Sequence, residues 1–396
     1  MRRQSTWLSR AIVVCIATTL LCGCARVTGL FDRSSSNSVK PNPLPTLTGS
    51  FQPRTVWAQS VNDGARSHYL KLVPAVLGNR LFVADFRGNL SAHRLDTGET
   101  VWSERTRLPI SGGPGAGADL VVAGTEEGEV AAFSAADGKS QWKVQLTSEI
   151  LAAPQIAEGV VVVRTVDGRL YGLQAVNGET IWIYDRSVPT LSLRGTSAPA
   201  LSDGLAVGGF DSGRIVAVGL TDGREVWEAR VSVPSGRTEL QRLVDVDAEP
   251  VIADGVTYAV TFQGRLVALD VKNGEALWRR EMSSHSGIAL DERRIFVSDT
   301  EGVIWGLSRD TSSTLWRQEK LKGRRLGAPA TYRGYLLVGD FEGYVHWLDA
   351  ASGEILGRVR VGDDEVLVRP VVAGDVVYVL GNGGDLAALS APARGR

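Results

Sequence analysis

A motif of two glycines and a tryptophan recurs along the chain roughly every forty residues, and no other feature constrains the fold as strongly. In each complete copy nine residues separate the glycines, and three separate the second glycine from the tryptophan. A period of this length accommodates four short strands joined by turns, which is one blade of a β-propeller. The five complete copies are Gly88/Gly98/Trp102, Gly128/Gly138/Trp142, Gly168/Gly178/Trp182, Gly213/Gly223/Trp227 and Gly264/Gly274/Trp278.

Degraded and partial copies follow the same spacing. Two copies carry substitutions, at Ser312 in Gly302/Ser312/Trp316 and at Gly357 in Gly343/Gly353/Gly357. An eighth copy opens at Gly384 without its tryptophan, while Trp57 near the other end lacks its glycine pair. The two partial copies complete each other. The repeat therefore predicts an all-β fold, an eight-bladed β-propeller of four-stranded antiparallel blades, whose ring is closed by the N-terminal strand completing the last blade.

One copy shows the expected strands in detail. A β-branched run at 159–164 precedes a turn at Gly168, and residues 169–173 alternate between apolar and polar. Asn177-Gly178 is a hairpin signal before a fourth strand at 179–184. Because the tryptophans keep a constant register with the turn glycines, they are predicted to pack between blades and not to form a ligand cage. They are Trp57, Trp102, Trp142, Trp182, Trp227, Trp278 and Trp316.

Composition argues against nucleic-acid binding. The formal net charge is −1, and the chain has no block rich in lysine and arginine. Removal of the first 23 residues would take away three arginines and no acids, leaving 40 basic side chains against 44 acidic ones. No basic stripe interleaved with aromatic residues is present, so no nucleic-acid partner is expected.

The N-terminus has the pattern of an export signal. Arg2-Arg3 precedes an apolar stretch from Ala11 to Leu21, which is shorter than a comfortable membrane span. Leu21-Cys22-Gly23-Cys24 then resembles a bacterial lipobox, which implies a lipoprotein signal peptide at 1–23 and lipidation of Cys24. An ordinary secretory signal with an incidental cysteine is the alternative. Ala25 after the lipidated cysteine would favour the outer membrane over the inner one.

A tether is expected between the lipid and the propeller. Residues 24–50 contain the lipidated cysteine and a stretch rich in serine and proline, and residues 51–396 form the predicted propeller domain. A flexible tether of this length has an end-to-end distance of roughly 25–30 Å. The propeller would then lie near the periplasmic face of the outer membrane without entering it.

Catalytic motifs are missing. The run from Leu269-Asp270 to Trp278 resembles the blades of quinoprotein dehydrogenases, which carry pyrroloquinoline quinone and calcium. All three cysteines lie at 15, 22 and 24, so a mature chain would lack the vicinal cysteine pair of those enzymes. The four histidines, at 68, 93, 285 and 346, have no metal-ligand spacing. We therefore predict no enzymatic activity, no catalytic residue, no cofactor and no metal.

Two successive inter-repeat segments are long and carry unusual side chains. From tryptophan to the next repeat's first glycine most intervals are 24–27 residues, that after Trp57 is 31, and the successive ones after Trp182 and Trp227 are 31 and 37. The first contains Leu191, Leu193 and Arg194, and the second contains Asp245 and Asp247. Leucines beside opposite charges are typical of a partner-binding hot spot. Burial of the leucines with internal pairing of Arg194 is equally consistent, and a calcium site at the two aspartates is a third interpretation.

The same segments carry a family resemblance. Leu191-Ser192-Leu193-Arg194-Gly195 and Arg242-Leu243-Val244-Asp245-Val246-Asp247, with the lipobox and the eight repeats, resemble the BamB family. This family is the lipoprotein subunit of the β-barrel assembly machinery of Gram-negative outer membranes. The resemblance extends over the whole mature chain, including 338–347 near its end.

The resemblance implies a non-catalytic protein that docks on the periplasmic POTRA domains of BamA, the barrel-inserting subunit. Positions matching Leu191, Leu193, Arg194, Asp245 and Asp247 belong to the family's docking surface. Other machinery subunits would be further partners, and blade edges would offer unfolded outer-membrane protein clients a β-augmentation site. The rival readings are a quinone-dependent dehydrogenase and a sensor or polysaccharide-binding propeller that takes a ligand in its central channel.

Overall fold

The computed structural model describes residues 40–47, 51–65, 68, 70–186, 197–211, 213–232 and 246–392. Residues from Pro41 onward form one compact unit. Strands and turns make up this described part, which contains no helix long and apolar enough to cross a membrane.

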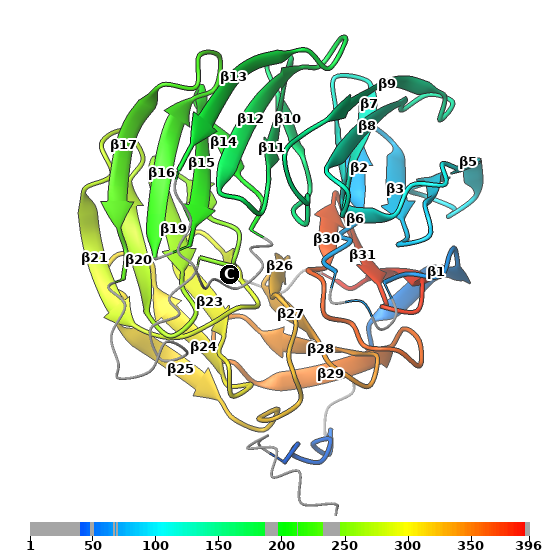
Figure 1. Ribbon diagram of the computed structural model, residues 1–396. Coiled ribbons are helices and arrows are strands. Elements are labelled where there is room, and N and C mark those ends of the chain that lie inside the picture. The colour runs from blue at the N-terminus through cyan, green and yellow to red at the C-terminus, as the bar shows by residue number, and fades with distance from the viewer. Residues whose placement is uncertain are drawn as a thin grey trace, which may run out of the picture. The chain divides into compact units, whose positions relative to one another are not determined.

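Eight antiparallel sheets of four strands each follow one another around a ring, which confirms the predicted propeller (Figure 1). Blade 1 comprises β2 (Ala75–Leu77), β3 (Arg80–Ala84), β4 (Asn89–Arg94) and β5 (Thr100–Arg105), and blade 2 comprises β6 (Ile110–Gly117), β7 (Leu120–Thr125), β8 (Glu129–Ser134) and β9 (Ser140–Gln145). Blade 3 comprises β10 (Gln155–Ala157), β11 (Val160–Arg164), β12 (Arg169–Gln174) and β13 (Thr180–Asp185), and blade 4 comprises β14 (Ala200–Ser202), β15 (Leu205–Phe210), β16 (Arg214–Gly219) and β17 (Glu225–Arg230).

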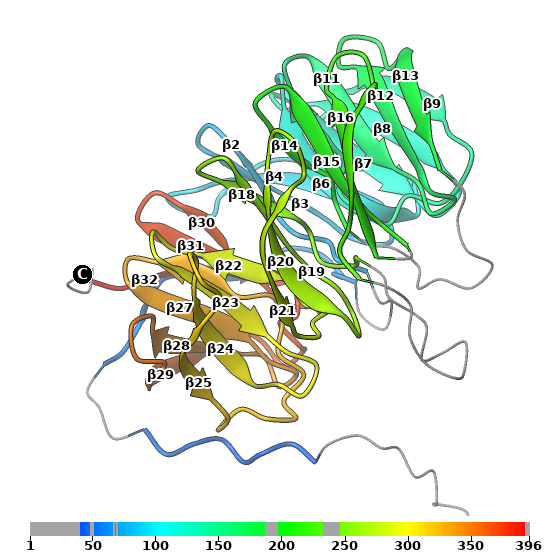
Figure 2. The ribbon, with the colours of Figure 1, turned by 90° about the vertical axis from the view of Figure 1, so that its left-hand side faces the viewer.

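The second half of the ring repeats this order, and Figure 2 shows blades 6 and 7 with β30–β32 gathered on one side of the molecule. Blade 5 comprises β18 (Val251–Ala253), β19 (Val256–Val260), β20 (Arg265–Asp270) and β21 (Ala276–Glu281), and blade 6 comprises β22 (Ile288–Leu290), β23 (Arg294–Ser298), β24 (Ile304–Ser308) and β25 (Thr314–Gln318). Blade 7 comprises β26 (Ala330–Tyr332), β27 (Tyr335–Gly339), β28 (Tyr344–Asp349) and β29 (Ile355–Arg360), and blade 8 comprises β30 (Val371–Ala373), β31 (Val376–Leu380), β32 (Asp385–Ser390) and β1 (Arg54–Ser60).

The ring is closed by β1, as predicted. Strand β1 pairs antiparallel with β32, from Arg54 opposite Ser390 to Ser60 opposite Asp385. The first strand of the chain therefore supplies the outer strand of the last blade. Closure in this way leaves only the innermost and outermost strands of each blade as sheet edges.

Each repeat tryptophan bridges two blades. It lies on the outer strand of one blade and its indole N–H donates to the carbonyl that follows the third strand of the next, at 2.8–3.1 Å. In its own blade it faces a glycine or alanine on the third strand, which leaves room for the ring. The seven pairs are Trp57 with Leu95, Trp102 with Ala135, Trp142 with Ala175, Trp182 with Leu220, Trp227 with Val271, Trp278 with Arg309 and Trp316 with Ala350.

The second glycine of the repeat is required by the same contact. Gly98 has φ of +77°, and a Cβ there would lie 2.8 Å from the ring of Trp57. Corresponding clashes occur where Gly138 meets Trp102 and where Gly353 meets Trp316. The glycine of one repeat and the tryptophan of the preceding repeat therefore constrain each other across the interface between their blades.

Blade 7 exchanges the two partners of this arrangement. Its third strand carries Trp347 opposite Gly357 on the outer strand, so the large and small residues have changed places. Trp347 is fully buried. Phe51, which precedes β1, packs on Gly357 and lies 5.9 Å from Trp347 and 4.9 Å from Tyr335 between ring centroids. The space left by the missing tryptophan side chain at Gly357 is thus taken up by Trp347 and Phe51.

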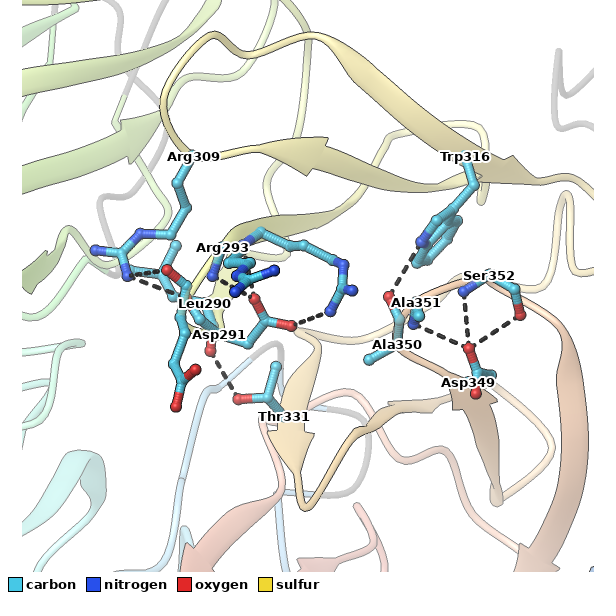
Figure 3. A network of polar contacts seen from close by, with 12 residues as sticks. Leu290, Asp291, Arg293, Arg309, Trp316, Thr331, Asp349, Ala350, Ala351 and Ser352 are labelled. Atoms are coloured by element: carbon cyan, nitrogen blue, oxygen red, sulfur yellow. Dashed lines mark hydrogen bonds and ion pairs between the residues drawn. The ribbon is translucent and has the colours of Figure 1, made fainter. Parts of the chain in front are cut away.

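Figure 3 shows the standard interface between blades 6 and 7, where Trp316 reaches Ala350 and Thr331 donates to the carbonyl of Leu290 at 2.8 Å. The interface between blades 7 and 8 lacks such a tryptophan. There the hydroxyl of Tyr332 donates to Asp375 at 2.7 Å and to Ala391 at 3.3 Å. Tyr332 therefore reaches the carbonyl that a repeat tryptophan would otherwise have bonded.

Candidate partner-docking site

Most of the predicted site lies outside the described residues. Leu191, Leu193, Arg194 and Asp245 belong to 187–196 and 233–245, and Cys24 belongs to 1–39. Asp247 is described and is only 7% exposed. The described residues before and after them show how the propeller holds the two long connections, which we call loop A (187–196) and loop B (233–245).

Both ends of loop A are tied to the chain that carries loop B. At its start, Arg186 forms ion pairs with Glu225, at 3.6 Å, and with Glu228, both on β17. Arg214 on β16 also pairs with Glu228. These charges join the residue before loop A to β17, the strand that precedes loop B.

The two loops also return to the propeller together. Ser197 is fully buried directly after loop A, and its hydroxyl donates to the carbonyl of Ala248 at 3.1 Å. Val246, the first described residue after loop B, is buried against Gly209 of β15. Described residues before and after loop A thus contact described residues before and after loop B.

A lysine supports the base of loop B from across the ring. Lys71 precedes blade 1, yet its ammonium donates to the carbonyls of Asp247 and His285, which precede blades 5 and 6, each at 3.2 Å. Burial lowers the pKa of Lys71, while the carboxylates of Asp247 and Glu249 oppose that shift. Lys71 therefore links the segment before blade 1 to the segment after loop B on the opposite side of the propeller.

A second cation contacts the same segment. Arg369, which precedes β30 of blade 8, donates to the carboxylate of Glu249 at 2.8 Å. Both residues line a central cavity of about 660 Å³ bounded by the inner strands of all eight blades. Six of the eight inner segments place a proline there, and proline suits an edge strand because it lacks an N–H. These prolines are Pro74, Pro114, Pro199, Pro250, Pro329 and Pro370.

A buried arginine lies between blades 3 and 4. Arg164 at the end of β11 pairs with Asp211 at 3.3 Å, and both side chains are almost fully buried between blades 3 and 4. Two further nitrogens of Arg164 have no partner among the described residues. Sequence reasoning missed both Arg164 and Lys71. Their apolar neighbours could have indicated that both side chains are buried, since Arg164 follows four valines and Lys71 lies between two leucines.

The described residues contain no group of three or more histidine, cysteine, aspartate or glutamate side chains placed to hold a metal ion. The calcium interpretation at Asp245 and Asp247 involves one residue outside the described part. The carbonyl of Asp247 instead accepts a hydrogen bond from Lys71.

Comparison with known proteins identifies the family. A family profile described as outer membrane protein assembly factor BamB matches residues 86–318 and 301–395. The protein of that name from Pseudomonas aeruginosa is 46% identical over 358 residues, covering 89% of this chain and 94% of the relative. The chain belongs to the BamB family. The resemblance inferred from the two loop motifs is thereby confirmed.

Other BamB proteins agree over nearly the whole chain. The one from Escherichia coli K12 is 36% identical over 368 residues, covering 90% of this chain and 93% of the relative. The crystal structure of BamB from Moraxella catarrhalis matches with a TM-score of 0.79 and 28% identity, covering 86% of this chain and all of that one. A quinohemoprotein alcohol dehydrogenase from Pseudomonas putida shares the fold, with a TM-score of 0.70 at 12% identity. That similarity concerns the scaffold alone.

Proposed function

We propose that this BamB family member is a non-catalytic scaffold subunit of the outer-membrane β-barrel assembly machinery. Its relatives are named as outer membrane protein assembly factors. In this proposal the chain is anchored by Cys24 in the inner leaflet of the outer membrane and docks on the POTRA domains of BamA. Other subunits and unfolded barrel proteins are further partners.

The proposed docking site is supported by the contacts between the residues next to loop A and the chain on either side of loop B. The hydrogen bond from Ser197 to Ala248 and the ion pairs of Arg186 bring the two connections together on one side of blade 4. Leu191 and Leu193 would bury against the partner, while Arg194 and Asp245 make charge-assisted contacts that set its orientation. Asp247 would act from the base, since its side chain is largely buried.

Affinity purification of the full chain from detergent-solubilised membranes tests this proposal. Arg194→Glu should lose a large co-purifying β-barrel protein, with docking weakened by about 2–4 kcal/mol if the arginine is a hot spot. Arg224→Glu is the matched control, because Arg224 is exposed at the turn between β16 and β17, at the other end of blade 4. A partner retained by a folded Arg194→Glu variant would place the interface elsewhere. Absence of any barrel partner from the wild type would overturn the function itself.

A further inference from the structure

The N-terminal segment before β1 is held against the propeller over blade 7. The main-chain N–H of Asn42 donates to the carbonyl of Lys322 at 2.9 Å, and its side-chain amide donates to the carbonyl of Glu319 at 3.0 Å. Arg358 on β29 donates to the carbonyl of Pro45 at 2.8 Å. Part of the predicted tether at 24–50 is therefore attached to the propeller.

A buried arginine forms the principal receptor for this segment. Arg324 has a side chain that is 3% exposed, and it donates to Asp340 at 2.8 Å and to Glu342. Its guanidinium also lies over the ring of Phe341, 5.0 Å from the centroid. A remaining nitrogen donates to the carbonyl of Asn42 at 3.1 Å. Because so many contacts orient Arg324, it presents a prearranged donor to the segment.

The segment is also prearranged. Pro41, Pro43 and Pro45 alternate with Asn42 and Leu44. Proline restricts its own φ, and it disfavours helical conformation in the residue before it, so this stretch is extended before it docks. The conformational entropy lost on docking is correspondingly small.

Topology shows where this segment lies. Strands alternate in direction within a blade, so each connection after a fourth strand lies at the same face of the ring. We call this the docking face, because loops A and B follow the fourth strands β13 and β17. Glu319 and Lys322 follow β25, another fourth strand, so Asn42 lies at the docking face. Strand β1 is also a fourth strand, and it begins at the opposite face.

We propose that residues 41–47 form a belt over blade 7 that makes the membrane tether leave the propeller at the docking face. Without the belt the tether would start beside Phe51, toward the opposite face. With it, the free chain runs from Cys24 to Asn42, and its end-to-end distance is about 21–25 Å. Gly357 also contributes, because its missing side chain makes room for Phe51, which lies between the belt and β1 in the sequence. The importance of the exit face rests on the predicted anchor and on the proposed docking loops.

Distances between spin labels test the belt in the full chain purified in detergent. The native cysteines are Cys15, Cys22 and Cys24, so after the predicted processing two introduced cysteines are the reactive thiols. One label is placed at Lys40→Cys, and the second at Glu126→Cys or Ala136→Cys. These two exposed positions lie in blade 2, at the docking face between β7 and β8 and at the opposite face between β8 and β9.

The belt predicts a narrow distance distribution from residue 40 to residue 126, shorter than that from 40 to 136. Asn42→Ala combined with Arg358→Ala removes the two side-chain donors of the belt contacts and leaves the main-chain bonds of Asn42, so it should broaden both distributions while leaving the circular dichroism spectrum unchanged. Arg360→Ala is the matched control, because Arg358 and Arg360 both lie over Tyr344 but only Arg358 reaches Pro45.

Broad distributions in the parent protein, or a shorter distance to residue 136, would overturn the proposal. So would an Asn42→Ala/Arg358→Ala variant that behaves like Arg360→Ala. No partner protein is needed for these measurements. Failure of the belt is therefore distinguishable from failure of the proposed docking function, which the Arg194→Glu purification reports.

Discussion

Blade 4 and blade 7 both depart from the repeat, blade 4 in its surface connections and blade 7 in its buried core. Blade 4 keeps the standard packing, with Trp227 opposite Ala217 and bonded to Val271, and its departures are the long connections on either side. Blade 7 has connections of ordinary length, and its departure is the exchange of Trp347 and Gly357 in the core. Function is proposed for both, as a docking site and as the receptor of the N-terminal belt.

The difference shows what each location tolerates. Extra residues in a surface connection add closure entropy that grows only slowly with length, so blade 4 needs no compensating change in its core. A core position must keep its volume filled, because protein interiors are close-packed. Blade 7 could therefore lose its outer tryptophan only where other groups, Trp347 and Phe51, took up the space.

The largest expected effect comes from breaking the exchange in blade 7. Trp347→Ala should destabilise the protein by about 3–5 kcal/mol in urea unfolding, since it removes a fully buried aromatic side chain. Adding Gly357→Trp alone should not restore stability, because a Cβ at Gly357 already lies 2.9 Å from Phe51. Phe51→Ala as a third change should restore part of it. Equal stabilities for the double and triple variants would show that Phe51 does not fill the vacated site.

The second effect concerns Lys71, which bonds the segment that follows blade 4 and loop B. Lys71→Met should cost about 1–3 kcal/mol of folding stability, because the carbonyls of Asp247 and His285 lose their buried donor, and it should weaken partner docking through the segment after loop B. Hydrogen exchange of the peptide after loop B should rise in the isolated chain. Lys139→Met, at an exposed turn of blade 2, is the control. Unchanged exchange in Lys71→Met would contradict a positioning role.

A third test lies in blade 1, which the N-terminal strand contacts through Gln59. His93 is 2% exposed and lies 3.2 Å from Gln59. Burial lowers the pKa of His93 below its ordinary value of 6.5, although a hydrogen bond to Gly98 opposes the shift. The unfolded chain then binds more protons between the folded pKa and about 6.5, so the free energy of unfolding should fall as the pH drops through this window.

The slope for a single group cannot exceed about 1.4 kcal/mol per pH unit, and urea titrations between pH 5 and 7 would measure it. His93→Gln should remove this component. A slope that persists in His93→Gln would assign the pH dependence to other groups.

The smallest expected effect comes from the joined loop bases. Ser197→Ala should cost about 0.5–1.5 kcal/mol of folding stability, the usual net value of one hydrogen bond, because Ala248 loses its buried donor. Docking should weaken as well if the bond keeps loops A and B together. Ser202→Ala, whose hydroxyl bonds only the adjacent Asp203 at an exposed site, should change neither quantity. Unaltered docking by Ser197→Ala would mean that the ion pairs of Arg186 suffice to join the loops.

The propeller could be predicted from the sequence because the repeat motif lies within a short stretch of chain in each blade. Gly98, Trp102 and their counterparts keep a fixed spacing within each repeat and each contacts an adjacent blade, so the copies can be counted even where the connections differ in length. The orphan Trp57 predicted the closing strand for the same reason. The seventh repeat was harder to interpret, since Gly357 reads as a lost tryptophan until Trp347 is found opposite it.

The sequence by itself determined the fold class, the number of blades, the closing strand and the position of the two long connections. It did so because each depends on periodicity or length. Only the tertiary structure decided that Ser197 meets Ala248, that Lys71 reaches Asp247, and that Asn42 lies against Arg324. These pairs are separated by 51, 176 and 282 residues. No local preference encodes such contacts, because they exist only once the ring has closed and brought distant blades within hydrogen-bonding distance.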